Sequence, residues 1–249
     1  MSEPRRTAVV TGASSGIGAA TARRLVREGF AVVMGARRLD RLEAIAAETG
    51  AVPLHLDVTD PASVVEFCGA VETCDVLVNN AGGALGLDSI AEAQEERWRE
   101  MYDVNVLGTL RMIRALLPKL LAGGNGHVVV IGSVASTDTY VRGGGYNAAK
   151  FAVRALREVL RKEMLGTPLR VTQIDPGLVE TEFSLVRFQG DVEAAARVYE
   201  GTTPLTADDV ADCVAWAVTR PPHVNIDEIK VLARDQSTAT TVFRRPAGS

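Results

Sequence analysis

Cysteine and histidine are scarce in this sequence, and their spacing argues against a metal centre. The 249 residues include three cysteines and three histidines: Cys68, Cys74, Cys213, His55, His127 and His223. The cysteines are odd in number and widely spaced, so they form neither a zinc-binding pattern nor an obvious disulfide set. We therefore predict no metal site, and we interpret the histidines as structural residues.

The chain also lacks an excess of positive charge and a long apolar run. Its formal net charge is −4, so no basic surface indicates nucleic-acid binding. No apolar run approaches the roughly 18 residues of a membrane-spanning helix, and no apolar core of a signal peptide follows residues 1–6. The sequence thus predicts a protein of the reducing cytoplasm, without nucleic-acid or membrane partners.

What the chain does contain is a regular alternation of short β-branched runs and amphipathic stretches. The expected strands are 8–10, 31–35, 52–56, 75–78, 127–131, 169–174 and 226–232. The expected helices are 19–28, 39–49, 62–72, 91–121, 147–165 and 205–219. This alternation predicts an α/β fold, a Rossmann-type doubly wound parallel sheet of about seven strands with helices on both faces. A chain of this length can fold as one unit, so we predict a single domain over residues 1–249.

A glycine-rich turn lies between the first expected strand and the first expected helix. Gly12, Gly16 and Gly18 follow the strand with the spacing Gly-x-x-x-Gly-x-Gly. Such glycines allow a tight turn and a close backbone approach, and a pyrophosphate can then bind at the helix N-terminus. Glycine-rich turns also join strands to helices without any ligand, but the flanking elements favour nucleotide binding here.

The residues after the second strand indicate which dinucleotide binds. A site for NAD has an acidic residue near this point, which binds the ribose 2′-hydroxyl. This chain has Arg37 and Arg38 instead. Two guanidinium groups suit a 2′-phosphate, so the pair favours NADP over the alternative of a solvated turn that carries two arginines.

Two further strand ends carry residues suited to a cofactor. Asp57 follows the third strand and can accept a hydrogen bond from an adenine amino group, or it can cap the next helix, although Asp60 before Pro61 fits that role better. The fourth strand ends in the small residues of 79–83, which allow a cofactor to approach closely.

A phenol and an ammonium group stand four positions apart at the start of the expected helix 147–165. Tyr146 and Lys150 would therefore point into the same space. A nearby cation lowers the pKa of a phenol, so the pair is a candidate proton-transfer device. Ser133, at the end of the fifth strand, can hydrogen-bond a substrate oxygen, and Asn105 is an unusual polar residue within the expected helix 91–121.

In this combination of motifs the chain resembles the short-chain dehydrogenase/reductase family. The resemblance lies in the glycine-rich run 11–18, Asp57, the run 79–82, Asn105, Ser133, Tyr146 with Lys150, and Pro176–Gly177 with Thr181. It implies a catalytic tetrad in which Tyr146 is the general acid/base and Ser133 holds the substrate oxygen. It also implies that Lys150 lowers the pKa of Tyr146 and binds the nicotinamide ribose, while Asn105 holds a water that links Lys150 to solvent.

The same resemblance implies a set of cofactor-binding residues. They are Gly12, Ser14, Ser15, Gly16, Ile17, Gly18, Arg37, Arg38, Asp57, Val58, Asn80, Ala81, Gly82, Tyr146, Lys150, Pro176, Gly177, Val179 and Thr181. Members of the family usually form dimers or tetramers through two long helices, here near 95–121 and 147–165. The expected helix 91–121 indeed has more apolar residues than one buried stripe needs, so we expect a homo-oligomer.

A narrower resemblance concerns the substrate. The run 181–191 is similar to the lid of NADP-dependent 3-hydroxy acid dehydrogenases, a group that includes serine and allo-threonine dehydrogenases, and it predicts a lid near 181–203. Arg187 in this run can pair with a substrate carboxylate, or it can be an ordinary surface residue. The chain departs from the group at Asp138, Arg142 and 143–145, which line the substrate mouth in the family.

The sequence therefore predicts an NADP-dependent oxidoreductase that acts on a small 3-hydroxy acid or its semialdehyde. One alternative is a reductase of an uncharged ketone or aldehyde, with Arg187 facing solvent. Another is a non-catalytic nucleotide-binding regulator on the same fold, because fold alone does not fix function.

Overall fold

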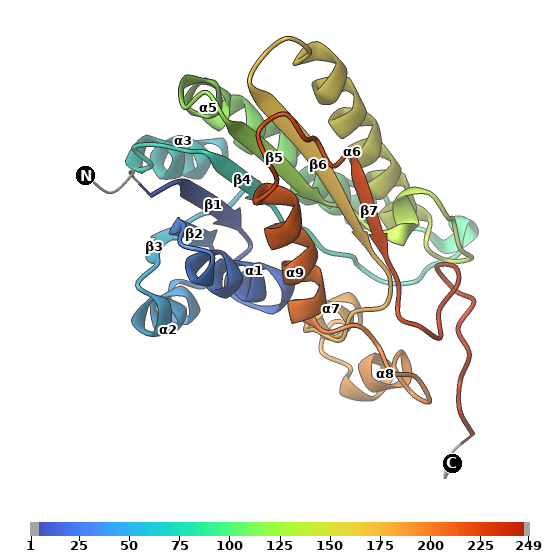
Figure 1. The fold of residues 1–249 in the computed structure, drawn as a ribbon. Coiled ribbons are helices and arrows are strands. Elements are labelled where there is room, and N and C mark those ends of the chain that lie inside the picture. The colour runs from blue at the N-terminus through green and yellow to red at the C-terminus, as the bar shows by residue number, and fades with distance from the viewer. Residues whose placement is uncertain (1–4, 247–249) are drawn as a thin grey trace.

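A computed structural model describes residues 5–246 and places seven strands in one parallel sheet (Figure 1). The order is β3-β2-β1-β4-β5-β6-β7, and every neighbouring pair is parallel. The strands are β1 (Thr7–Thr11), β2 (Ala31–Ala36), β3 (Val52–His55), β4 (Val76–Asn79), β5 (Gly126–Ile131), β6 (Leu169–Pro176) and β7 (Glu228–Val231). This confirms the predicted fold class; the predicted domain also includes residues 1–4 and 247–249, which lie outside the described residues. Because the chain reverses its winding direction between β1 and β4, their carboxyl ends flank the crevice where such sheets bind ligands.

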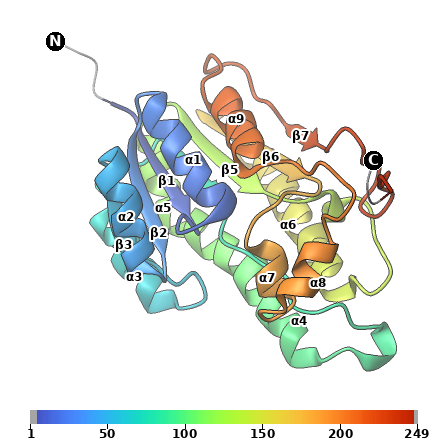
Figure 2. The same ribbon diagram turned by 90° about the horizontal axis from the view of Figure 1, so that it is seen from below.

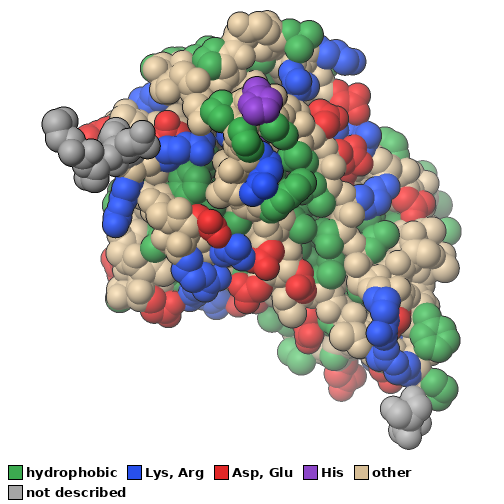
Figure 3. Space-filling model, viewed as in Figure 1, with side chains coloured by type: hydrophobic (Ala, Val, Ile, Leu, Met, Phe, Trp, Pro, Cys, Tyr) green, Lys and Arg blue, Asp and Glu red, His purple; other side chains and the backbone are tan. Residues whose placement is uncertain are grey.

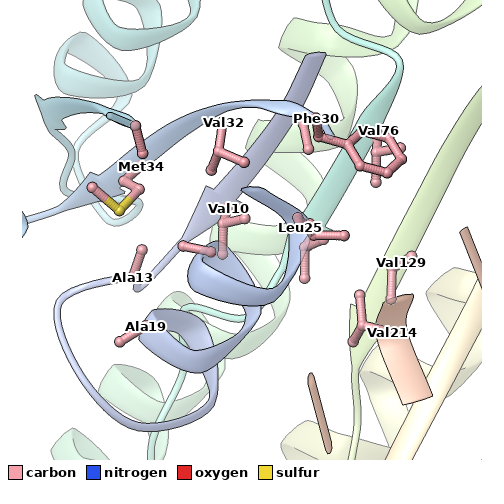
Figure 4. Close-up of a cluster of buried hydrophobic side chains, with 14 of the residues drawn as sticks. Val10, Ala13, Ala19, Leu25, Phe30, Val32, Met34, Val76, Val129 and Val214 are labelled. Carbon is pink, nitrogen blue, oxygen red and sulfur yellow. The ribbon is translucent and has the colours of Figure 1, made fainter. Parts of the chain in front are cut away.

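Helices cover both faces of the sheet (Figure 2). On one face, α1 (Gly16–Arg27), α2 (Leu39–Thr49) and α9 (Ala207–Val218) bury a cluster that includes Leu25 and Val214 (Figure 4). On the other face, α3 (Pro61–Ala70), α5 (Gly108–Ala122) and α6 (Gly144–Glu163) bury a second cluster. Side chains alternate across a strand, so Val10 of β1 belongs to the first cluster and Val9 to the second. Burial on both faces explains why these strands read as continuous apolar runs.

The expected helix 91–121 is interrupted, which corrects the prediction. A short 3₁₀ turn, η1 (Ile90–Glu92), is followed by α4 (Glu95–Tyr102), a π turn η2 (Asp103–Leu107) and then α5. The physical reason is Asn105. Its side-chain amide donates to the Met101 carbonyl at 2.7 Å, the acceptor that the residue's own N–H would use in an α-helix, so the backbone widens locally.

The predicted lid, 181–203, contains two short helices, α7 (Phe183–Arg187) and α8 (Val192–Arg197). Gln189 and Gly190 between them have φ values of 54° and 94°, which no α-helix accommodates. Asp191 then caps α8 by accepting from the Ala194 N–H. Both helices lie beyond the carboxyl end of the sheet (Figure 2).

Side chains cap two other helices, and the Asp60 cap was expected from the sequence. Thr206 caps α9 in a capping box with Asp209, and Asp60, with Pro61 in the first turn, caps α3. Asp57 is therefore left for another role. A short 3₁₀ turn, η3 (Val134–Ser136), follows β5.

Charged side chains of both signs are mixed on the face seen in Figure 3. Within residues 5–246, no helix is both long and apolar enough to cross a membrane. In the same part of the chain, His, Cys, Asp and Glu side chains form no group of three or more that would hold a metal ion.

Candidate active site

A cleft of about 1070 Å³ opens at the carboxyl ends of the strands and brings most of the predicted site residues together. The predicted residues that line it are Gly12, Ser14, Ser15, Gly16, Ile17, Arg37, Arg38, Asp57, Val58, Asn80, Ala81, Gly82, Ser133, Tyr146, Lys150, Pro176, Gly177, Val179, Thr181 and Arg187. Gly18 and Asn105 stand behind the cleft wall. The carboxyl ends of parallel strands meet at one edge, which is why residues so far apart in sequence converge.

The glycine-rich turn is held by close backbone contacts. Gly12 and Gly16 adopt positive φ values of 65° and 52°, which favour glycine. A Cβ atom on Gly18 would overlap the carbonyl oxygen of Gly12. The Asn80 side chain donates to the carbonyls of Thr11 and Gly12 at 2.9 and 3.2 Å, so β4 holds the turn in place. The start of α1 therefore faces the cleft with its N–H groups, where a pyrophosphate can bind.

The two arginines after β2 behave differently. Arg38 donates to the hydroxyls of Ser14 and Ser15 and forms an ion pair with Glu182 at 2.9 Å. Arg41 forms a second ion pair with the Glu182 carboxylate, with 2.6 Å between Arg41 Nη1 and Glu182 Oε1. Sequence reasoning missed Arg41 and Glu182, although Arg41 lies one helical turn after Arg38 and so shares its face of α2.

Arg37 lies on the other side, toward Asp57. Burial alone would raise the pKa of Asp57, but hydrogen bonds from Thr59 and the charge of Arg37 outweigh it, and the pKa falls below its ordinary value. One oxygen of Asp57 accepts from both the N–H and the hydroxyl of Thr59, at 2.9 and 2.7 Å. The Asp57 side chain is thus ionised and fixed at the cleft wall.

Tyr146 and Lys150 occupy the first turns of α6 and are both buried, with 9% and 7% of their surface exposed. The Lys150 Nζ donates to the carbonyl of Ile131 at 3.0 Å and lies 5.7 Å from the centre of the Tyr146 ring. Burial lowers the pKa of Lys150 to about 8, against the opposing charge of Asp175.

The expectation that Lys150 lowers the pKa of Tyr146 stays a prediction, because the net shift of that pKa is upward. Burial raises the pKa of Tyr146 above its ordinary value. A hydrogen bond with Ser133 and the charge of Arg187 act in the opposite direction but do not offset it. Sequence spacing places the cation near the ring, but it does not reveal how completely both groups lose their water.

Ser133 is positioned by a buried carboxylate that sequence reasoning did not single out. Its N–H donates to Asp175 Oδ1 at 2.8 Å, and its hydroxyl accepts from the Ala135 N–H at 3.1 Å. Asp175 is fully buried and also accepts from Gln173 and Ser136. A Cβ on Gly132 would overlap Asp175 Oδ1. The available signal was an acidic residue directly after the predicted strand 169–174, since a buried charge needs such partners.

Asn105 is 1% exposed and bonds to the main chain on two sides. Its Nδ2 donates to the carbonyls of Gly83 and Met101 at 2.9 and 2.7 Å, and its Oδ1 accepts from the Gly83 N–H at 3.3 Å. These bonds join the loop after β4 to α4 and the π turn. The water-holding role of Asn105 stays a prediction.

Arg187 extends from the end of α7 over the Tyr146 ring. Its Nε donates to the Gly86 carbonyl at 3.2 Å and its Nη2 to the Tyr140 hydroxyl at 2.9 Å. The guanidinium lies 5.5 and 5.8 Å from the ring centres of Tyr140 and Tyr146. Within the described part of the chain no carboxylate lies within 4 Å of it. Arg187 is thus a half-buried cation without an acidic partner, and not the solvent-facing residue of the alternative interpretation.

A second, small cavity of about 10 Å³ lies between Arg187, Tyr146 and the positions where the chain departs from the 3-hydroxy acid group. That volume holds about one water molecule. Arg142, which has a φ of 66°, lines it and donates to the Leu87 carbonyl at 2.7 Å. Asp138 instead accepts from the Ala239 N–H, and so supports the C-terminal segment.

A dinucleotide-type crevice next to a buried tyrosine, lysine and serine defines an oxidoreductase of the doubly wound α/β class. A family model described as short chain dehydrogenase matches residues 6–190, and the chain belongs to that family. An uncharacterized oxidoreductase of Mycobacterium tuberculosis is 55% identical over 242 residues, 97% of this chain and 96% of the relative. An NADP-dependent 3-hydroxy acid dehydrogenase of Salmonella typhi is 43% identical, over 93% of this chain and 96% of the relative. A solved structure, the closed form of serine dehydrogenase complexed with NADP⁺, matches with a TM-score of 0.91 and 39% identity, over 96% of this chain and 100% of that one.

Proposed function

We propose that this protein is an NADP-dependent dehydrogenase/reductase that interconverts a hydroxyl and a carbonyl on a small 3-hydroxy acid or the matching semialdehyde. Membership of the short-chain dehydrogenase family supports the reaction class. The observation that carries the substrate class is Arg187, a half-buried guanidinium above Tyr146 with no acidic partner within 4 Å among residues 5–246. The relatives named for 3-hydroxy acids and serine agree with this assignment.

The cleft fits NADP. When bound, the nicotinamide cofactor carries the hydride. The backbone of the glycine-rich turn and the start of α1 line the cleft and would hold its pyrophosphate. Arg38, supported by the hydroxyls of Ser14 and Ser15, would hold the 2′-phosphate. The NADP⁺-bound neighbour supports the same cofactor.

The proton is assigned to Tyr146. Its raised pKa keeps the phenol protonated near neutral pH, which is the form that donates a proton to a carbonyl oxygen during reduction. Ser133 would hold that oxygen beside the phenol, with its own position fixed by Asp175. Lys150 and Arg187 each lie within 6 Å of the Tyr146 ring centre, so both stabilise the phenolate that remains.

The carboxylate of the substrate is assigned to Arg187. A guanidinium holds a carboxylate through two parallel, charge-assisted hydrogen bonds. The Arg187 guanidinium lies 5.8 Å from the centre of the Tyr146 ring, so a carboxylate bound to it would lie near the phenol. The segment 181–203 would act as a lid that carries this residue to the substrate.

An initial-rate panel at 340 nm tests the proposal. Serine, allo-threonine, 3-hydroxypropionate and 3-hydroxyisobutyrate would be compared with uncharged secondary alcohols of similar size. We expect the acids to react, and Arg187→Ala to lower kcat/KM for them by about 10- to 100-fold, since a hydrogen bond to a charged group contributes roughly 1.5–3 kcal/mol. Arg197→Ala is the matched control, because Arg197 is an exposed arginine of the neighbouring helix α8.

If only the uncharged alcohols react, or if Arg187→Ala and Arg197→Ala behave alike, the carboxylate assignment is wrong and a reductase of uncharged ketones or aldehydes replaces it. A protein that binds NADPH but turns over no substrate would point to the non-catalytic regulator.

A homo-oligomer is part of the proposal. Helices α4 to α6 expose Tyr102, Leu110, Phe151 and Val159, with 37–50% of their surface accessible. An exposed apolar surface of this kind favours association with a second copy. Light scattering after size exclusion would distinguish a dimer or tetramer from a monomer. A monomer would contradict the assignment.

A further inference from the structure

The anion that occupies the Arg38–Arg41 pair is a carboxylate of the protein itself. Glu182 Oε2 lies 2.9 Å from Arg38 Nη1, and its Oε1 lies 2.6 Å from Arg41 Nη1. The two arginines hold the pKa of Glu182 at about 2, so the carboxylate is ionised throughout the physiological range. Glu182 immediately precedes α7 and thus lies at the start of the proposed lid, 181–203.

This contact spans the cofactor cleft. Glu182 and Arg38 both line it, and they belong to segments separated by 144 positions in the chain. Arg38 also bonds to Ser14 and Ser15 of the glycine-rich turn. The adjacent Thr181 lies against Gly16, at 3.3 Å from the point where a Cβ would stand. The Glu182 carboxylate therefore lies where the glycine-rich turn, the end of β2 and the lid meet.

A 2′-phosphate at this place needs the same guanidinium N–H groups that Glu182 now uses. Glu182 occupies the Nη1 group of each arginine, and a phosphate that carries nearly two charges is repelled by an adjacent carboxylate. NAD has a hydroxyl at the 2′ position, so its binding does not require Glu182 to leave. The Glu182 carboxylate would therefore oppose the binding of NADP more than that of NAD.

We propose that Glu182 is an internal competitor of the cofactor 2′-phosphate for Arg38 and Arg41, and that this residue limits the preference of the enzyme for NADP over NAD. Arg41 is then a phosphate ligand in addition to Arg38. The inference rests on the proposed use of NADP, but it does not depend on the substrate.

The three side chains are 39–44% exposed, which limits the strength of each ion pair. Exposed pairs typically contribute about 0.2–1 kcal/mol, so breaking two of them corresponds to roughly a two- to thirtyfold change in affinity. We expect Glu182→Gln, which keeps the shape of the side chain and removes its charge, to lower the Kd of NADPH by about that factor. The Kd of NADH should stay within about twofold.

Equilibrium titration of nicotinamide fluorescence with the full-length variants measures both constants without any substrate. Glu180→Gln is the matched control, because Glu180 is exposed, lies on the same segment and makes no ion pair within 4 Å in the described part of the chain. It removes the same charge two positions away. Arg38→Ala and Arg41→Ala should each raise the Kd of NADPH by about tenfold or more and change that of NADH little.

The outcomes distinguish an error in the phosphate site from an error in the proposed competition by Glu182. If Arg38→Ala leaves NADPH affinity unchanged, the phosphate site itself is misplaced and the proposed cofactor geometry fails. If Arg38→Ala weakens NADPH but Glu182→Gln matches Glu180→Gln, only the competition is refuted. If Glu182→Gln weakens NADPH, Glu182 holds the lid onto the bound cofactor and does not compete with it, and the inference is overturned.

Discussion

Replacing Lys150 by methionine should make the protein more stable, and the gain should depend on pH. Lys150 is buried, and its pKa falls from the ordinary 10.5 to about 8. A tenfold change in proton affinity corresponds to about 1.4 kcal/mol, so keeping this ammonium charged in the folded protein costs roughly 3 kcal/mol at pH 7. Methionine removes that cost but leaves the Ile131 carbonyl without its 3.0 Å partner, which offsets about 1 kcal/mol. We expect a net gain of about 2 kcal/mol in the free energy of unfolding.

The pH dependence of the stability difference follows from how many protons the folded and the unfolded chain bind. Below pH 8 the lysine is protonated in the folded and the unfolded chain, and the full cost is present. Between pH 8 and 10.5 the unfolded chain binds more protons than the folded one, so the wild-type protein gains stability relative to the variant as pH rises. The difference in the free energy of unfolding between the variant and the wild-type protein should therefore be largest at pH 7 and should be smaller at pH 9.5.

Urea unfolding, followed by circular dichroism at fixed protein concentration from pH 7 to 9.5, measures this gap. Lys162→Met, at an exposed position of the same helix, is the control and should show no such pH dependence. A Lys150→Met protein that is less stable than wild type at pH 7, or a gap that is constant with pH, would refute the reasoning. The variant should be stable and inactive, as expected where a site retains a buried charge for function.

Three further predictions concern single features. Tyr146→Phe should lower kcat by at least about 100-fold, because it removes the proposed acid but keeps the ring contact with Phe183, and the Kd of NADPH should stay within about twofold; substantial residual turnover would contradict the assignment. Thr206→Ala should destabilise the protein by about 1 kcal/mol and Thr206→Ser much less, as measured by thermal unfolding, because only the first loses the cap of α9. Burial raises the pKa of Cys68 to about 11 and that of Cys74 to about 12, so a thiol reagent at pH 8 should label them only after denaturation; rapid labelling of the native protein would show that they are accessible.

The sequence was sufficient for the fold and for the convergence of the motifs. Strand and helix periods are local properties, and the carboxyl ends of parallel strands must meet at one edge. The sequence alone therefore places the glycine-rich turn, Ser133, Tyr146 and Lys150 together.

The remaining features depend on side-chain contacts between distant segments. Nothing near Glu182 in the chain indicates that its carboxylate meets Arg38 and Arg41 across the cleft. The pKa of Tyr146 follows from burial that spacing cannot reveal. The π turn at Asn105 likewise depends on a side-chain bond to Met101 and on the neighbouring loop at Gly83. In each case tertiary contacts override a local pattern.

The contact between Gly132 and Asp175 determines which positions tolerate change in directed evolution. Any side chain at position 132 would displace the Asp175 carboxylate, which accepts from the Ser133 N–H. Library variants substituted at this position would therefore not be folded and active. Arg142 and Arg187 instead bond to loop carbonyls at the small cavity beside Tyr146. A search for new substrate ranges would therefore keep Gly132 and Asp175 constant and randomise the loop that carries Arg142 together with the end of α7.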